Sequence, residues 1–214
     1  SQFSSQGIQI VTSIILARLL MPDDFGIIGM AGIVTGLAGV FRDLGFGQAL
    51  VQRPELRDEH KRSAFWVTLI MAGLLYGGVY LVAPYAGEYF RDERMVPVLR
   101  IMALSFLMAP FGVVPRSLLQ RELNFKRPFV ADLAGTIAYG GVGITSAVLG
   151  YGYWSLVWAL LASSAVGTVA ICIITRYAPP LIPSLRGARD LLAFGTGVTG
   201  VVLFSVVAEK LDYL

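Results

Sequence analysis

The longest uncharged segment constrains the fold of this chain most. Residues 133–175 form a run of 43 residues without Asp, Glu, Lys or Arg. As one helix it would be about 64 Å long, roughly twice the hydrocarbon thickness of a bilayer. The sequence GYGYW at 150–154 interrupts it with two glycines and with aromatic residues suited to a membrane–water interface. We therefore expect two membrane-spanning helices separated by a turn.

The rest of the chain repeats this pattern. Hydrophobic residues make up 56% of the 214 residues and charged residues 14%, against about 25% charged in an average soluble domain. A soluble all-α core is the alternative, but its helices would need polar outer faces, which these runs lack. We predict an all-α, polytopic transmembrane bundle with spans near residues 5–21, 25–50, 63–87, 95–115, 128–149, 153–175 and 189–212.

Lysine and arginine are distributed unevenly among the expected loops. Three alternate loops hold eleven of them: Arg53, Arg57, Lys61, Arg62, Arg116, Arg121, Lys126, Arg127, Arg176, Arg186 and Arg189. The opposite loops hold only Arg91 and Arg94. The positive-inside rule then places the N-terminus and the basic loops in the cytoplasm. Nucleic-acid binding is the alternative reading of the basic loops, but topology explains them more simply.

The short outer loops leave no room for an outer domain in this chain. Asp23-Asp24 could imitate the acidic cluster of a glycosyltransferase, but after Pro22 they fit the N-terminal cap of a helix better. His60 is the only histidine and Cys172 the only cysteine. The sequence has no metal-ligand spacing, nucleophile elbow, Walker loop or dinucleotide fingerprint. We expect no metal, no cofactor and no enzymatic activity.

A glycine stripe marks the second expected span. Five glycines follow one another at spacings of 3, 3, 4 and 3 residues: Gly26, Gly29, Gly32, Gly36 and Gly39. Such a stripe predicts close contact with another helix. Sliding or bending of helices during a transport cycle is the functional alternative.

Ionisable residues inside membrane spans are costly, so they are the candidate functional residues. They are Arg18, Arg42, Asp43, Arg100 and Asp132. Arg18, Arg100 and Asp132 lie near enough to a span end to reach the interface instead. The neighbours Arg42 and Asp43 could also simply pair with each other.

Several motifs occur in order along the whole chain: LARLLMPDDFGIIGMAGIV, FRDLGFGQALVQRPEL, HKRSAFWVTL, VPVLRIMALSFLMAPFGVVPRSLLQRELNFKR, GYGYWSLVW and the closing DLLAFGTGVTGVVLFSVVAEKLDYL. In these the chain resembles Wzx-type lipopolysaccharide, O-antigen and exopolysaccharide flippases of the multidrug, oligosaccharidyl-lipid and polysaccharide exporter superfamily. The resemblance implies a fragment of a protein about twice as long. Residues 1–175 would form the first lobe, 176–188 a cytoplasmic linker, and 189–214 the first helix of a second lobe.

The resemblance also implies a function. Such a protein flips polyprenyl-diphosphate-linked oligosaccharide across the bacterial inner membrane, for polysaccharide biosynthesis, by alternating access between two lobes. The family pattern carries over to Arg18 for substrate and Asp43 for ion coupling, whereas Arg42 and Arg100 as substrate ligands and Asp132 as a coupling carboxylate rest on chemistry alone. Expected partners are the lipid-linked substrate, membrane lipid and polysaccharide assembly proteins, with no nucleic acid.

Other functions remain open from the residues. They are a multidrug exporter, a peptidoglycan-precursor flippase, a membrane glycosyltransferase or polymerase, and a membrane partner that transports nothing.

Overall fold

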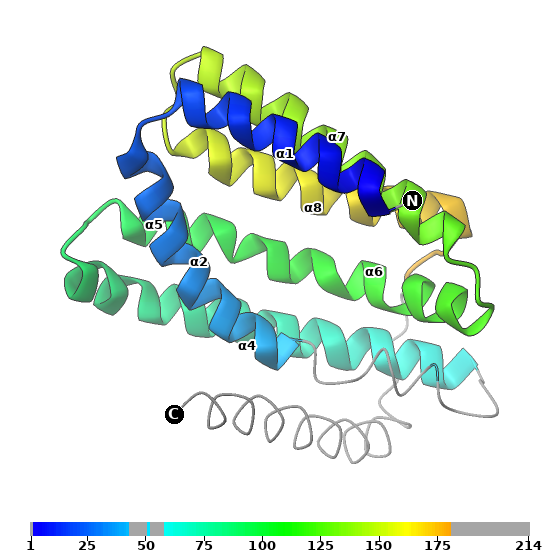
Figure 1. The fold of residues 1–214 in the computed structure, drawn as a ribbon. Helices are drawn as coiled ribbons and strands as arrows, with labels where there is room; N and C mark the ends of the chain where they lie inside the picture. The colour runs from blue at the N-terminus through cyan, green and yellow to red at the C-terminus, as the bar shows by residue number, and fades with distance from the viewer. Residues whose placement is uncertain (1, 43–50, 52–57, 181–214) are drawn as a thin grey trace, which may run out of the picture.

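The computed structural model of this protein describes residues 2–42, 51 and 58–180, and the structural statements below concern these residues. They form helices and no strand, which confirms the all-α prediction. The helices are α1 (Gln2–Leu19), α2 (Pro22–Arg42), α4 (Asp58–Phe90), α5 (Met95–Met102), α6 (Leu104–Arg121), α7 (Lys126–Val148) and α8 (Trp154–Thr175) (Figure 1).

The break predicted inside the longest uncharged run is present. Helix α7 ends at Val148 and α8 begins at Trp154. The turn needs glycine, because φ is +84° at Gly150 and +55° at Gly152, a region that costs other residues energy. The two halves of the run therefore fold back on each other.

Three helical segments are long and apolar enough to cross a membrane: Asp58–Phe90, Met95–Arg121 and Trp154–Thr175. The predicted total of seven spans stays a prediction, and its last span, residues 189–212, lies outside the described residues. Many of the most exposed side chains are large and apolar, among them Leu74, Leu81 and Ile173. A surface of this kind suits hydrocarbon rather than water.

The helices lie side by side in an order that differs from their order in the chain. Helix α1 lies on α7, α7 lies along α8, α8 contacts α6, and α6 lies along α4 (Figure 1). Helix α2 contacts α4 and α5. The largest buried cluster joins these helices around Ile27, Met95, Leu99, Phe106 and Val157. This core holds α2 beside α4 and α5.

The fourth predicted span needs a correction. Its end was expected at residue 115, before Arg116, but α6 continues to Arg121. Pro110 and Pro115 both lie inside the helix and are buried, and packed neighbours allow a membrane helix to tolerate them. Leu119, only 2% exposed, anchors the extra turn. Arg116 is therefore a helix residue and not a loop residue.

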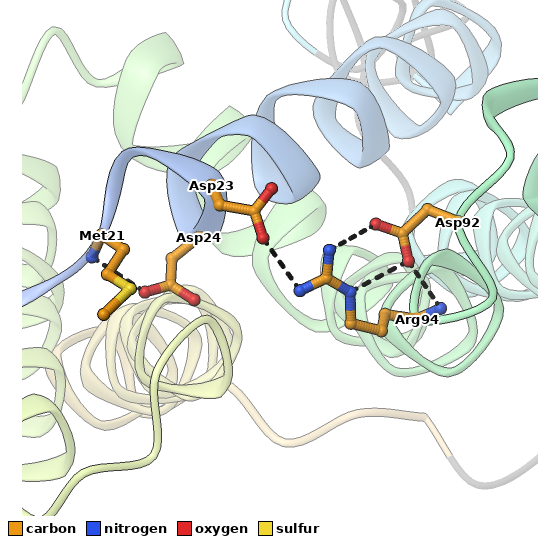
Figure 2. A network of polar contacts seen from close by, with 5 residues as sticks. All are labelled: Met21, Asp23, Asp24, Asp92 and Arg94. Carbon is orange, nitrogen blue, oxygen red and sulfur yellow. Dashed lines mark hydrogen bonds and ion pairs between the residues drawn. The ribbon is translucent and has the colours of Figure 1, made fainter.

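The expected N-terminal cap of the second span is present, but only one of the two carboxylates, that of Asp24, accepts a capping hydrogen bond (Figure 2). Helix α2 starts with Pro22 in its first turn, and the Met21 backbone N–H donates to Asp24 Oδ2 at 3.0 Å. This is the reach-back half of a capping box. The prediction is thus confirmed for Asp24, whereas Asp23 pairs with the guanidinium of Arg94 at 3.0 Å.

Arg94 joins the loops at this end of the bundle. It also binds Asp92 at 2.8 Å, and its guanidinium lies 5.9 Å from the ring centre of Tyr153 in the α7–α8 loop. The hydrogen bond from Arg94 lowers the pKa of Asp92 below its ordinary value. The α1–α2, α4–α5 and α7–α8 loops, all expected on one side, therefore meet at one end.

The predicted close packing of the glycine stripe is wrong for the described part of the chain. A Cβ placed on Gly26, Gly29, Gly32, Gly36 or Gly39 would meet no described atom within 4 Å. Helix α7 makes the close glycine contacts instead. A Cβ on Gly135 would lie 2.9 Å from the Ser163 carbonyl oxygen, and one on Gly143 would lie 3.2 Å from Ala159 Cβ. Small residues thus bring α7 close to α8.

We expect Gly135→Ala to destabilise the fold, because the carbonyl it meets belongs to the α8 backbone and cannot turn aside. The expected cost is about 1–3 kcal/mol, as for overpacking elsewhere. Gly141→Ala is the matched control on the same helix, since a Cβ there meets nothing within 4 Å. It should be neutral or stabilising by about 0.5–1 kcal/mol. Thermal unfolding in detergent measures both, and equal shifts would contradict the proposed contact.

Candidate functional site

A polar groove runs through the bundle between α2, α6, α7 and α8. It consists of two adjoining cavities of about 630 and 460 Å³ that share Ser105, Ser163 and Ser164. Its hydroxyl groups come from Thr35, Ser105, Thr136, Ser163, Ser164 and Thr168. We call this the polar groove.

Helical spacing places one face of each helix in the polar groove. On α6 the lining residues Ser105, Ala109, Gly112 and Arg116 are spaced by 4, 3 and 4 residues, which is one side of a helix. Ser105 and Arg116 are eleven residues apart, about 16 Å along the axis. The groove therefore extends over about half of a bilayer's hydrocarbon thickness.

Glycines give the polar groove its width. Gly32, Gly36 and Gly39 of α2 line it, and no described atom would touch a Cβ on any of them. The stripe that was expected to pack against a helix thus faces open space. Larger side chains at these positions would narrow the groove.

Several hydroxyls in the polar groove are stabilised by their own helices. Thr35 Oγ1 donates to the Ala31 carbonyl at 2.8 Å, and Ser105 Oγ donates to the Met102 carbonyl at 2.7 Å. Thr136 Oγ1 donates to the Asp132 carbonyl at 2.9 Å. Such bonds make a hydroxyl tolerable in an apolar bundle and leave its oxygen free to accept. These three hydroxyls therefore have a hydrogen-bond partner when the groove is empty.

One ion pair lies in the polar groove. Arg116 Nη2 of α6 donates to Asp132 Oδ1 of α7 at 2.7 Å. The two side chains are 42% and 53% exposed, so both are open to the groove. The Arg116 Nε lies 3.7 Å from where a Gly112 Cβ would be, which shows that the side chain runs back along α6.

The structure places one of the five predicted site residues in the polar groove, namely Asp132. Arg18 is an exposed residue near the end of α1 and does not line the groove. Arg100 lies on α5 with its guanidinium 4.1 Å from the ring centre of Tyr80, also outside the lining. Arg42 is the last residue of α2, and the structure describes its backbone but not its side chain. Asp43 lies outside the described residues.

Sequence reasoning missed Arg116 and the hydroxyls. Arg116 follows Pro115 and precedes further basic residues, a pattern that predicts a loop. A helical reading of residues 105–116, with Ser105, Gly112 and Arg116 on one face, is the signal that could have found it. Its pairing with Asp132, sixteen residues away on the next helix, has no sequence signal.

Nothing in the described part of the chain forms a metal-binding group, since no three His, Cys, Asp or Glu side chains come together there. Hydroxyls, a guanidinium and a carboxylate are the chemistry of the groove. These groups recognise polar or anionic ligands by hydrogen bonds and charge. They lie in a chain whose outer surface is apolar.

The chain is similar to three bacterial proteins over nearly its whole length. It is 30% identical over 200 residues to the succinoglycan biosynthesis transport protein ExoT of Rhizobium meliloti, covering 94% of this chain and 40% of the relative. It is 24% identical to the lipopolysaccharide biosynthesis protein WzxC of Escherichia coli, covering 97% and 43%. It is 28% identical to the teichuronic acid biosynthesis protein TuaB of Bacillus subtilis, with the same coverage.

The chain therefore spans about two fifths of the length of these relatives. No solved structure matches it. The family model of polysaccharide biosynthesis proteins matches residues 15–214. Together with its apolar helices, this match identifies the chain as a multi-pass membrane protein that belongs to the polysaccharide biosynthesis protein family.

Proposed function

We propose that this chain forms the N-terminal lobe of a transporter that moves polyprenyl-diphosphate-linked oligosaccharide across the cytoplasmic membrane of a bacterium. The protein would work by alternating access and would not be an enzyme. The names of ExoT, a transport protein, and of two polysaccharide biosynthesis proteins support this proposal.

The polar groove is the observation that carries the proposal. A sugar–diphosphate head group cannot cross hydrocarbon unshielded, because polar groups and charges lose their hydration there. The groove combines apolar residues such as Phe106 and Leu160 with six hydroxyls and the Arg116–Asp132 pair, and these polar groups offer replacement hydrogen bonds. The lipid tail could stay in the bilayer while the head group follows the groove.

The lobe arrangement is part of the same proposal. Residues 1–175 would be the first lobe, 176–188 a cytoplasmic linker and 189–214 the first helix of a second lobe. Arg18, Arg42 and Arg100 remain proposed substrate ligands, and Asp43 and Asp132 remain proposed ion-coupling carboxylates. Polysaccharide assembly proteins are proposed partners.

Filling the polar groove should stop transport. We expect Ser164→Trp to abolish surface polysaccharide in a flippase-null strain complemented with the protein that contains this chain, with membrane abundance near normal. Val166→Trp is the control, because Val166 is an exposed residue of the same helix that does not line the groove. Full complementation by Ser164→Trp would remove the groove from the transport path.

The proposed membrane orientation provides a second test. Reporters fused after Lys61, Lys126 or Arg186 should be cytoplasmic, and reporters fused after Asp24, Asp92 or Gly152 should be periplasmic. The positive-inside bias of the loops is the reason. Reversed signals at two or more sites would refute the proposed orientation.

The proposed roles of Arg18 and Arg42 in substrate binding can be tested separately. If Arg18 or Arg42 binds substrate, Ala at either position should abolish surface polysaccharide at normal protein abundance. Lys should rescue in part if the positive charge is what matters, and poorly if a bidentate guanidinium contact matters. An interfacial role for Arg18 predicts instead that Ala is tolerated, or that it lowers abundance and activity together.

A further inference from the structure

We propose that Arg116 is the diphosphate-binding residue of the polar groove and that Asp132 holds its guanidinium only while the groove is empty. The inference rests on the proposed function and names the ligand of one groove residue. In this scheme the incoming phosphate replaces Asp132 at Arg116. Asp132 is then a competitor of the substrate, not a fixed structural partner.

The geometry of the pair suits exchange. A single hydrogen bond, from Arg116 Nη2 to Asp132 Oδ1, joins the two side chains. A guanidinium has five N–H donors, so most of its capacity is unused in this contact. Half-exposed ion pairs of this kind contribute little to stability, which makes the partner easy to replace.

The place of Arg116 in the groove fits the ligand. Its side chain runs back along α6 to the level of Gly112, in the cavity that Ser163, Ser164 and Thr168 of α8 also line. Phosphate oxygens accept two parallel bonds from a guanidinium, a geometry that the monodentate carboxylate contact does not use. The hydroxyls of Ser163, Ser164 and Thr168 in the same cavity can donate to further phosphate or sugar oxygens.

The exchange has an electrostatic consequence. The empty pair is neutral, so keeping it inside the bundle is tolerable. When a diphosphate takes Arg116, Asp132 is left as an unpaired carboxylate beside another anion, which is unfavourable in a groove with apolar surroundings. Removing the Asp132 charge should therefore strengthen, not weaken, anion binding.

Farnesyl diphosphate in detergent is the probe, with farnesol and inorganic diphosphate as comparison ligands, applied to the purified protein that contains this chain. We expect Arg116→Ala to weaken farnesyl diphosphate binding roughly 10- to 100-fold, the range for losing a hydrogen bond to a charged group. Asp132→Asn should tighten it up to about fivefold, the worth of an exposed ion pair. Farnesol binding should not change. Inorganic diphosphate that binds with the same dependence on Arg116 shows recognition of the anion without the tail.

Arg127→Ala is the matched control. Arg127 is an exposed residue of α7 that does not line the groove, and its loss changes the net charge by the same amount. A purely structural pair predicts that Asp132→Asn and Arg116→Ala lower the unfolding temperature and the affinity together. Weaker binding by Asp132→Asn, or unchanged binding by Arg116→Ala, would overturn the inference.

Flipping of lipid-linked oligosaccharide in vesicles, with the same variants, separates the two proposals. If wild-type protein flips and Arg116→Ala flips equally well, the role of Arg116 is refuted and the proposed function stands. If wild-type protein binds farnesyl diphosphate through Arg116 but flips no lipid-linked oligosaccharide, the proposed function fails and the binding role stands.

Discussion

The close approach of α7 and α8 is the contact on which the rest of the structure depends. Gly135 and Gly143 remove the side chains that would keep the two helices apart, so Ser163 and Ala159 of α8 lie directly against α7. In a lipid environment helices gain little from hiding apolar surface from each other, and tight packing of small residues is what associates them. This packing fixes the α8 face that the polar groove uses.

The polar groove forms because large side chains fill one part of the space between the helices and glycines leave the other part open. The buried cluster around Leu99 and Phe106 fills the space between α2 and the α5–α6 segment near one end of the bundle. Beyond it, the glycines of α2 and Gly112 of α6 leave the space open. Hydroxyls that bond to their own helix backbone can line such a space without a ligand. The molecule thus keeps a polar path in an apolar bundle at little energetic cost.

Arg94 and Arg116 show two uses of an arginine in the same bundle. Arg94 binds two carboxylates and lies over an aromatic ring, so its fork is occupied and it ties three loops together. Arg116 makes one bond to one carboxylate in an open groove. Because a guanidinium gains most from bidentate contacts, Arg94 is suited to holding structure and Arg116 to accepting a ligand.

The sequence by itself determined the helical, membrane-spanning character of the chain, the break at residues 150–154 and the cap at Asp24. These depend on local properties: apolar length, glycine at positive φ, and a carboxylate three residues beyond the N-cap residue of the helix. It also named Asp132, because a carboxylate inside an apolar run is costly wherever it lies. Only the tertiary structure decided that α6 extends past Pro115, that α7 rather than α2 makes the close glycine contacts, and that Arg116 faces Asp132. Spacing along one helix shows which residues share a face, but the partner of that face depends on how separate helices pack, and that is set by contacts between residues far apart in the chain.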